Sequence, residues 1–498
     1  MAVLKESVEE LREAFQSGRT RSEHWRRSQL KALLALVQRE EDAMFAALYR
    51  DLGKHKIEAY RDEVGVLVKS INFALDGLRD WMAPKRATIP LIAFPTTGQV
   101  IPEPLGVVLL FSSWNFPIDG LLAITSDSGI PANTGLALEP VIGAITAGNA
   151  VALKPSEYAP ASAQFLADTI PKYLDNNAVK VFPGGVQVGE RLLEHRWDKI
   201  FFTVGGRRAG SPRVGRIIMT AAAKHLTPVV LELGGKCPVI VDTLTSVSDQ
   251  EVTAKRVVAG KWGPCCGQAC IGIDYLLVEE KFASIMVDLL RKTIKSFYKD
   301  PSNISKIVHR QHFMRLKKLL AEPSVASSIV HGGSYDDDKL SFEPTILLDP
   351  PLDAEVMTEE IFGPILPIIT LKKIEDSVAF VRERPKPLAI YVFTNDEAFK
   401  RQVIEGTSSG SVTFNDAIIQ FACDALPFGG VGQSGFGRYH GKYSFDTFSH
   451  EKAIMKRSLL LEFTFRYPPW NETKLKFMRA VYNFDYLSLA LLLLGLKK

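Results

Sequence analysis

The feature that most constrains the fold of this chain is a regular alternation of short β-branched runs with helical segments, which begins at Gly106. Alternation of this kind predicts a parallel, doubly wound α/β sheet that binds its ligands at the carboxyl ends of the strands. The predicted strands are residues 106–112, 150–154, 179–182, 199–203 and 229–232, and predicted helices lie between them at 161–174 and 212–224.

Helices and a hairpin are predicted ahead of this region. The N-terminal 55 residues carry apolar side chains at helical spacing, and Thr20 with Glu23 predicts a capping box at the start of one helix. A second helical stretch spans about 57–81 and ends before Pro84. Prolines among β-branched residues at 87–104 predict edge strands or a hairpin.

Composition excludes several classes of protein. The 498 residues are enough for two or three domains, and 60 Lys+Arg nearly balance 56 Asp+Glu, which argues against a nucleic-acid partner. Five cysteines are too few for a disulfide framework in a chain of this size, so a reduced, intracellular setting fits. The chain has no run of about 18 apolar residues, and its first ten residues lack the apolar core of a secretory signal. We therefore expect a cytoplasmic protein.

Five short motifs occur in the order in which one enzyme family has them. They are Trp114-Asn115-Phe116-Pro117, Leu153-Lys154-Pro155-Ser156-Glu157, Leu231-Glu232-Leu233-Gly234-Gly235-Lys236, Gly267-Gln268-Ala269-Cys270 and Glu359-Glu360-Ile361-Phe362-Gly363-Pro364. On these motifs the chain resembles an aldehyde dehydrogenase from its N-terminus to about Lys452. The segment 427–435, followed by Tyr439-His440-Gly441, is similar to the class 3 branch, which includes fatty aldehyde dehydrogenases. The resemblance implies oxidation of a medium or long aliphatic or an aromatic aldehyde to the carboxylic acid.

Cys270 is the candidate nucleophile. Thiolate attack on an aldehyde gives a thiohemiacetal whose oxyanion can expel hydride to a nicotinamide cofactor and leave a thioester. A buried, inert cysteine is the alternative, whereas a zinc site is not expected because the spacing of Cys265, Cys266 and Cys270 lacks a matching His or Cys pair. We expect Cys270 to have a low pKa. The resemblance makes Asn115 a donor to the oxyanion, together with the backbone N–H of Cys270, and makes Glu232 the base that activates water, its pKa raised by apolar neighbours.

The resemblance also implies NAD as the cofactor, with NADP as an alternative. The residues predicted to bind it are Lys154, Glu157, Gly210, Ser211, Gly215, Glu360 and Phe362. Lys154 and Glu157 follow a strand and would face the adenosine ribose, where a carboxylate accepts hydrogen bonds and repels a 2′-phosphate. Residues 210–215 form a Gly-x₄-Gly turn at a predicted helix N-terminus, which suits a pyrophosphate. Glu360 would hold the nicotinamide ribose, with Phe362 packed beside it.

The family fold implied by the resemblance has a Rossmann-like NAD(P)-binding domain, an α/β catalytic domain and a small β segment that bridges the subunits of a homodimer. The corresponding residues are 1–86 with 105–236 for the cofactor domain, 237–409 for the catalytic domain, 87–104 with 410–452 for the bridging segment, and 453–498 for a C-terminal tail.

Two segments depart from the family pattern. Residues 119–134 follow the predicted oxyanion donor, and residues 204–209 lengthen the cofactor turn and add Arg207 and Arg208. Inserts of this length cost little stability but can reshape the aldehyde entrance or weaken cofactor binding. A catalytically impaired, membrane-associated or scaffold homologue is therefore one alternative function. A CoA-acylating dehydrogenase is another, against which the presence of Glu232 argues.

The C-terminal tail carries an apolar run at residues 486–496, followed by Lys497 and Lys498. The run is about half as long as a membrane span requires. Two interpretations stay open. The run lies on a membrane surface as an interfacial helix with Tyr467 and Trp470 as anchors, which would make the protein peripheral on an endomembrane, or it packs on the core or on a second subunit.

Overall fold

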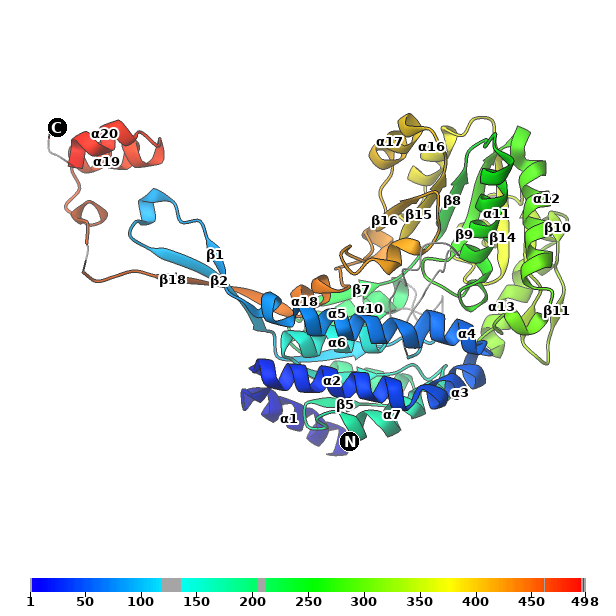
Figure 1. Ribbon diagram of the computed structural model, residues 1–498, viewed down its shortest axis with the longest axis horizontal. Helices are drawn as coiled ribbons and strands as arrows, with labels where there is room; N and C mark the ends of the chain where they lie inside the picture. The colour runs from blue at the N-terminus through cyan, green and yellow to red at the C-terminus, as the bar shows by residue number, and fades with distance from the viewer. Residues whose placement is uncertain (1, 119–135, 204–211, 461, 494–495, 497–498) are drawn as a thin grey trace. The chain divides into compact units, whose positions relative to one another are not determined.

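The computed structural model describes residues 2–118, 136–203, 212–460, 462–493 and 496 (Figure 1). The described residues form two units. The larger comprises Met1–Arg79 with Pro104–Ser449, and the smaller comprises Asp80–Glu103 with His450–Lys498.

The first sheet of the larger unit is the predicted doubly wound sheet. Its strand order is β17-β7-β6-β3-β4-β5, and all neighbours are parallel except β17 with β7. The strands are β3 (Val107–Phe111), β4 (Ala150–Lys154), β5 (Val179–Val181), β6 (Lys199–Thr203), β7 (Val229–Glu232) and β17 (Gly435–Phe436). Every residue of β3 and β4 is buried, as expected for parallel strands covered on both faces.

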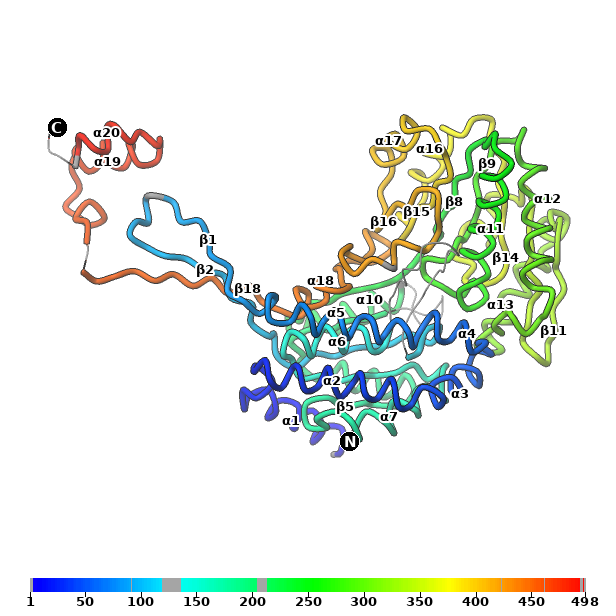
Figure 2. Tube along the Cα trace, viewed as in Figure 1, coloured from blue at the N-terminus to red at the C-terminus, as the bar shows by residue number. Residues whose placement is uncertain are grey.

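Helices cover this sheet. They are α1 (Ala2–Gln16), α2 (Glu23–Arg39), α3 (Glu41–Leu52), α6 (Leu138–Ala147), α7 (Pro160–Tyr173), α8 (Val186–Glu194) and α10 (Pro212–Ala223). Apolar side chains of α1, α8 and α10 share one hydrophobic core with the strands. The helices α2 and α3 pack against α7 (Figure 2).

The N-terminal helices confirm the helical prediction but correct its cap. Thr20 lies in a short 3₁₀ turn, Arg19–Arg21, and the residue that caps α2 is Ser22, whose hydroxyl accepts from the Trp25 N–H at 3.1 Å. The extra turn after Gly18 moves the cap two residues along the chain. Beyond α3 the chain forms α4 (Lys56–Ala59), a π-helical turn η2 (Tyr60–Val64) and α5 (Gly65–Met82), which ends before Pro84 as predicted.

The second sheet of the larger unit has the order β10-β13-β14-β9-β8-β15-β16. Its strands are β10 (Ile329–His331), β13 (Thr345–Leu348), β14 (Ile365–Leu371), β9 (Ile273–Glu279), β8 (Cys237–Val241), β15 (Ala389–Phe393) and β16 (Ser411–Phe414), parallel except β10 with β13. The accompanying helices include α11 (Val247–Trp262), α12 (Glu280–Phe297), α13 (Arg310–Ala321), α15 (Glu355–Thr358), α16 (Asp376–Arg382) and α17 (Glu397–Gly406).

This sheet changes one predicted boundary. Residues 410–452 were expected to bridge subunits, but β16 pairs with β15 in the second sheet and β17 pairs with β7 in the first. Most of that segment therefore belongs to the larger unit, and only its end, from about Ser449, contributes to the sheet of the smaller unit.

The smaller unit contains a three-stranded sheet, β1-β2-β18, made of β1 (Lys85–Ala87), β2 (Thr97–Pro104) and β18 (Ser449–Lys456). The antiparallel pairing of β1 with β2 confirms the predicted hairpin. After it, α19 (Glu472–Tyr482) and α20 (Tyr486–Leu493) share a small apolar cluster of Ala480, Val481 and Leu489. Among the described residues, none of the helices combines the length and apolarity needed to cross a membrane.

Candidate active site

Three of the predicted residues lie at the carboxyl ends of strands of the first sheet, whereas Cys270 precedes β9 and Glu360 and Phe362 precede β14. Asn115 follows β3, Lys154 ends β4 and Glu232 ends β7. This is the edge at which a doubly wound sheet binds its ligands. Two cavities open there, one of about 300 Å³ beside Lys154 and one of about 580 Å³ beside Glu360.

Cys270 lies in a tight turn between α11 and β9. The turn begins with Cys265 and Cys266, whose backbones adopt positive φ values of 48° and 55°. Cys270 is 7 % exposed. Burial, followed by the nearby carboxyl groups of Glu360 and Glu232, raises the pKa of its thiol. The prediction of a low pKa is therefore wrong for this arrangement of residues, because sequence gave no measure of burial or of how close the two carboxyl groups lie.

Asn115 is completely buried and its side-chain amide is fixed at both ends. Its Oδ1 accepts from the Ser113 hydroxyl at 2.7 Å, and its Nδ2 donates to the Gln268 carbonyl at 2.9 Å. Gln268 lies two residues before Cys270, so this hydrogen bond ties the predicted oxyanion donor to the nucleophile turn. An amide nitrogen carries two N–H groups, and one remains for a substrate oxygen.

Glu232 ends β7 and is 3 % exposed, with both carboxyl oxygens buried. Within the described part of the chain, neither of its carboxyl oxygens has a hydrogen-bond partner. Burial alone raises the pKa of Glu232 well above its ordinary value, as predicted from its apolar neighbours. A buried carboxyl group without a partner is costly, and such groups are typical of catalytic acids and bases.

Glu360 and Cys270 lie on either side of Gly234. A Cβ placed on Gly234 would lie 2.8 Å from Glu360 Oε1 and 3.4 Å from the Cys270 Cβ, and the φ of Gly234 is +93°. The N–H of Gly235 donates to Glu360 Oε1 at 2.9 Å. Burial raises the pKa of Glu360 to about 8, with the charge of Asp274 adding to the effect. The glycine pair thus lets a carboxyl group come close to the candidate nucleophile.

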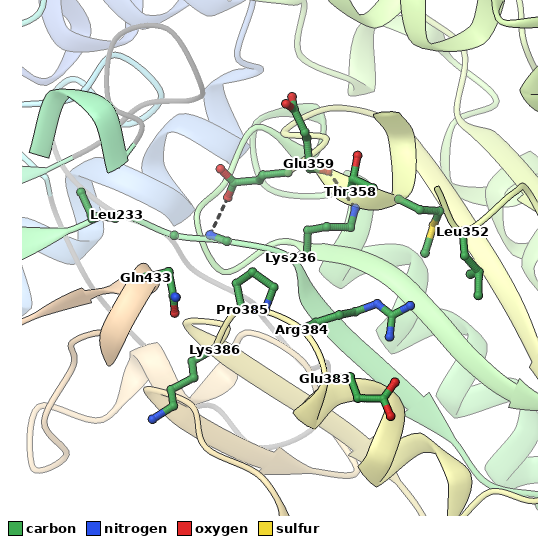
Figure 3. A pocket seen from close by; sticks show the side chains of 14 residues that line it. Leu233, Lys236, Leu352, Thr358, Glu359, Glu383, Arg384, Pro385, Lys386 and Gln433 are labelled. Atoms are coloured by element: carbon green, nitrogen blue, oxygen red, sulfur yellow. Dashed lines mark hydrogen bonds between the residues drawn. The ribbon is translucent and has the colours of Figure 1, made fainter. Parts of the chain in front are cut away.

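The turn that carries Glu360 and Phe362 is anchored by residues that sequence reasoning assigned no role. Lys236 Nζ forms an ion pair with Asp274 and donates to the carbonyls of Val356 and Glu359 at 2.8 and 2.9 Å. Figure 3 shows the Lys236 side chain extending to the turn at Thr358 and Glu359. The only signal in the sequence was the position of this lysine directly after the glycine pair.

Helix α13 supplies a second anchor. His312 Nε2 lies 2.7 Å from the Phe362 carbonyl, and Arg315 donates to the carbonyls of Glu360 and Ile361. Phe362 itself has a positive φ of 50° and packs edge-on against Trp114, with 5.4 Å between ring centres. The spacing of His312 and Arg315, three residues apart, puts them on one face of the helix and could have pointed to a shared task.

The cavity beside β4 is lined by two of the residues predicted to bind the cofactor. Lys154 Nζ pairs with Glu157 at 2.5 Å, and both residues line the cavity, as does Thr203, whose buried hydroxyl has no partner among the described residues. Gly215 lies inside α10, where an added Cβ would come 3.2 Å from Leu231, so its position allows the helix to pack closely on the sheet. Gly210 and Ser211 lie outside the described residues, as do the predicted inserts 119–134 and 204–209.

Comparisons with known proteins identify the family of the chain. The profile of the "Aldehyde dehydrogenase family" matches residues 2–454. The chain is 54 % identical over 499 residues to aldehyde dehydrogenase family 3 member F1 of Arabidopsis thaliana, covering 99 % of each chain, and 40 % identical to family 3 member A2 of Rattus norvegicus, covering 98 % and 97 %.

Two solved structures are similar along most of their length. One is the substrate-bound AldH of Staphylococcus aureus, with a TM-score of 0.89, 38 % identity and coverage of 97 % of this chain and all of the other. The second is an indole-3-acetaldehyde dehydrogenase complexed with NAD⁺, with a TM-score of 0.78, 25 % identity and coverage of 92 % and 89 %. The chain belongs to the aldehyde dehydrogenase family, on its family 3 branch, and is an oxidoreductase that acts on aldehydes.

Proposed function

We propose that the protein oxidises an aldehyde to a carboxylic acid through a thiohemiacetal and a thioester on Cys270, with NAD(P) as the acceptor. The observation that carries the proposal is the position of one buried thiol close to Glu360 across Gly234 and under the electrostatic influence of the unpartnered carboxyl group of Glu232. A nucleophile, a base and an anchor for a cofactor are the parts that this chemistry needs.

In the acylation step the Cys270 sulfur forms a bond to the aldehyde carbon, and the carbonyl π electrons move to oxygen. The Asn115 amide and the Cys270 backbone N–H donate to that oxyanion, and donors of this kind contribute about 3 kcal/mol each. The C–H bond of the thiohemiacetal then breaks, its electron pair leaving with the hydrogen as hydride, while the oxyanion re-forms the C=O bond and leaves a thioester on Cys270. A bound oxidised cofactor would supply the acceptor for that hydride and a positive charge that favours the thiolate over the thiol.

In the deacylation step Glu232 takes a proton from water while the water oxygen bonds to the thioester carbon. The C=O bond then re-forms as the C–S bond breaks, the acid leaves, and the proton on Glu232 passes to the sulfur to restore the thiol. The raised pKa of Glu232 brings the group closer to neutral pH, where a general base is most effective. A CoA-acylating enzyme would need no such base, so the unpartnered carboxyl group favours hydrolysis.

We propose NAD as the principal cofactor, with NADP accepted less well. Lys154 and Glu157 would hold the adenosine ribose, and Glu360 and Phe362 the nicotinamide ribose. The carboxylate of Glu157 would repel a 2′-phosphate, but its pairing with Lys154 at 2.5 Å weakens that repulsion. The indole-3-acetaldehyde dehydrogenase with a similar fold was solved with NAD⁺.

Medium or long aliphatic and aromatic aldehydes are the proposed substrates, on the strength of the class 3 resemblance in residues 427–441. A series of aldehydes of increasing chain length, each assayed with NAD and with NADP, tests this. A preference for the shortest aldehydes would contradict it. The alternative of an impaired homologue receives no support from the comparisons, in which relatives match over nearly the whole chain.

The smaller unit is proposed to mediate a homodimer. Strand β18 is an edge strand of its sheet, and Met455, Leu459 and Leu460 near it are 63 to 100 % exposed. Exposed edge strands and apolar side chains favour pairing with another chain. Replacing Leu459 and Leu460 with Asp should give a monomer by light scattering.

For α20, flotation with anionic vesicles distinguishes a membrane surface from a protein contact. Flotation of the full chain but not of a chain that ends at Pro469 would favour the membrane, and equal behaviour of the two chains would exclude it.

Trapping the acyl-enzyme tests the catalytic proposal. The Glu232→Gln enzyme mixed with hexanal and NAD should release one equivalent of NADH in a burst and then stall, with the acyl group on Cys270 detected by mass spectrometry. The Cys270→Ala enzyme should give neither a burst nor an adduct. Steady turnover by Cys270→Ala would refute the proposal.

A further inference from the structure

A buried ion pair lies behind the loop that carries Asn115. Lys54 follows α3 and Glu63 lies in the π-helical turn η2, and both side chains have no exposed surface. Lys54 Nζ lies 2.5 Å from Glu63 Oε1. Burial disfavours the charge on Lys54, but the attraction of Glu63 and other nearby acidic groups outweighs it and raises the pKa of Lys54. The ammonium group therefore keeps its three N–H donors.

Both members of the pair bind the backbone of residues 114–118. Lys54 Nζ donates to the Asn115 carbonyl at 3.0 Å and lies 4.1 Å from the centre of the Phe116 ring. Glu63 Oε2 accepts from the Ile118 N–H at 3.0 Å. The pair thus fixes one carbonyl and one N–H of the loop, three residues apart, without touching the Asn115 amide.

The same N-terminal segment also holds the nucleophile turn. Glu58 Oε1 accepts from the Cys265 N–H at 3.0 Å and from the Ser305 hydroxyl at 2.9 Å. The turn continues to Gln268, whose carbonyl accepts from Asn115 Nδ2. Residues 54–63 therefore contact the backbone on both sides of the hydrogen bond that joins the oxyanion donor to the nucleophile turn.

Stability alone is a poor reason for this arrangement. Removing two charges from water is costly, and apolar side chains of similar size often replace a buried ion pair with no loss of stability. Precise placement is a better reason, because an error of about 1 Å in the position of a catalytic group can cost about 100-fold in rate.

We propose that Lys54 and Glu63 are positioning residues, whose ion pair holds residues 114–118 so that the Asn115 amide points at the substrate oxygen. The inference rests on the proposed oxyanion role of Asn115. It predicts that damage to the pair lowers the rate of thiol acylation and leaves cofactor binding unchanged.

The test uses the full chain and an assay that needs no cofactor. An activated ester such as p-nitrophenyl acetate accepts the same thiol attack, forms the same oxyanion and releases p-nitrophenolate without any oxidation. Glu63→Gln leaves one oxygen to serve both Lys54 and the Ile118 N–H, so the loop loses an anchor. We expect ester hydrolysis and aldehyde kcat/KM to fall by about 10- to 100-fold, with the Kd for NAD within twofold of the wild type.

Asp51→Asn is the matched control. Asp51 lies in α3, is buried, and accepts from the N–H groups of Ala161 and Ser162 at 3.0 and 2.8 Å. The substitution makes the same chemical change to a buried carboxylate that binds backbone, but at the start of α7. We expect a similar loss of stability and less than a twofold loss of esterase activity. An equal loss of activity in both variants would overturn the proposal.

A double-mutant cycle separates positioning from general damage. Glu63→Gln should have less than a twofold effect on esterase activity in the Asn115→Ala enzyme, because the group that it positions is gone. A full, multiplicative loss there would overturn the positioning role alone. Full activity of Asn115→Ala by itself would instead refute the oxyanion role and the inference with it.

A second variant, with apolar side chains in place of the ion pair, tests the proposal if Glu63→Gln folds poorly. The double variant Lys54→Met with Glu63→Met removes both charges together and should fold, as judged by circular dichroism and thermal unfolding. We expect it to bind NAD normally and to lose about 10- to 100-fold in esterase activity. A folded double variant with wild-type esterase activity would overturn the proposal.

Discussion

Replacing Gly234 with Ala should weaken cofactor binding, because the added methyl group would displace Glu360, the residue proposed to hold the nicotinamide ribose. The added Cβ would lie 2.8 Å from Glu360 Oε1, too close for the carboxyl group to stay where the Gly235 N–H holds it at 2.9 Å. The φ of +93° adds a backbone penalty of about 1–2 kcal/mol for a residue with a Cβ. Loss of a hydrogen bond to a charged group costs about 1.5–3 kcal/mol, which corresponds to a loss of NAD affinity of about 10- to 100-fold.

The Gly235→Ala variant separates the effect of backbone strain from the effect of displacing Glu360. Its φ is +134°, but the nearest atom to an added Cβ is the Pro387 Cα at 3.8 Å, an ordinary contact. Both variants should therefore lose stability in urea, by about 1–3 kcal/mol, because both carry backbone strain. Only Gly234→Ala should lose NAD affinity, measured by quenching of tryptophan fluorescence at pH 9, where Glu360 with a pKa of about 8 is mostly ionised. Equal NAD affinities in the two variants would refute the role given to Glu360.

Four further outcomes are expected. Asn115→Ala should lower aldehyde kcat/KM by about 100- to 1,000-fold, the effect of losing one oxyanion donor, with NAD affinity unchanged. Because burial raises the pKa of Glu232, thioester hydrolysis in single-turnover experiments should speed up as pH rises through neutrality, and Glu232→Gln should abolish that rise. Iodoacetamide should alkylate Cys270 slowly in the free enzyme and faster with NAD present, as followed by peptide mass spectrometry; a fast reaction without NAD would contradict the raised thiol pKa. Burial and the charge of Asp424 raise the pKa of Glu139 to about 7, so the unfolded state loses this proton first and stability should fall as pH rises from about 4.5 to 7, by about 3 kcal/mol. Urea unfolding of Glu139→Gln across that range should lack this contribution.

The sequence predicted the local elements well because their signals are local. The β-branched run at Ala150–Lys154 became a strand with the same bounds, and the prolines at 87–104 did mark a hairpin. Pairing between distant strands was harder, because nothing in residues 411–414 identifies β15 as the partner. The low pKa expected for Cys270 failed for a related reason, since burial and the approach of two carboxyl groups are properties of the folded chain.

The residues that position the catalytic groups could not be predicted either, because their partners lie far away in the sequence. Lys54 and Glu63 lie in a helical region with nothing unusual in its composition, and their partners are some 60 residues away in the chain. Lys236 was part of a motif, but its two carbonyl partners lie beyond residue 350. Side chains that react could be predicted from their chemistry, whereas side chains that position them could be identified only from their contacts.

Burial raises the pKa values of three groups at the centre of the site and thereby disfavours the thiolate that catalysis needs. Burial is the largest cause of the raised pKa values of Cys270, Glu232 and Glu360, and the carboxyl groups of Glu360 and Glu232 further disfavour a negative charge on Cys270. Two ammonium groups near the site already bind carboxylates and backbone carbonyls, Lys236 at Asp274 and Lys54 at Glu63. A third, on the buried Lys261, has its pKa lowered to about 8 by burial, which weakens its positive charge. We expect the oxidised cofactor to supply further positive charge that stabilises a thiolate, so nucleophile activation should follow cofactor binding. Such an order would keep the thiol a weaker nucleophile until an acceptor for the hydride is in place.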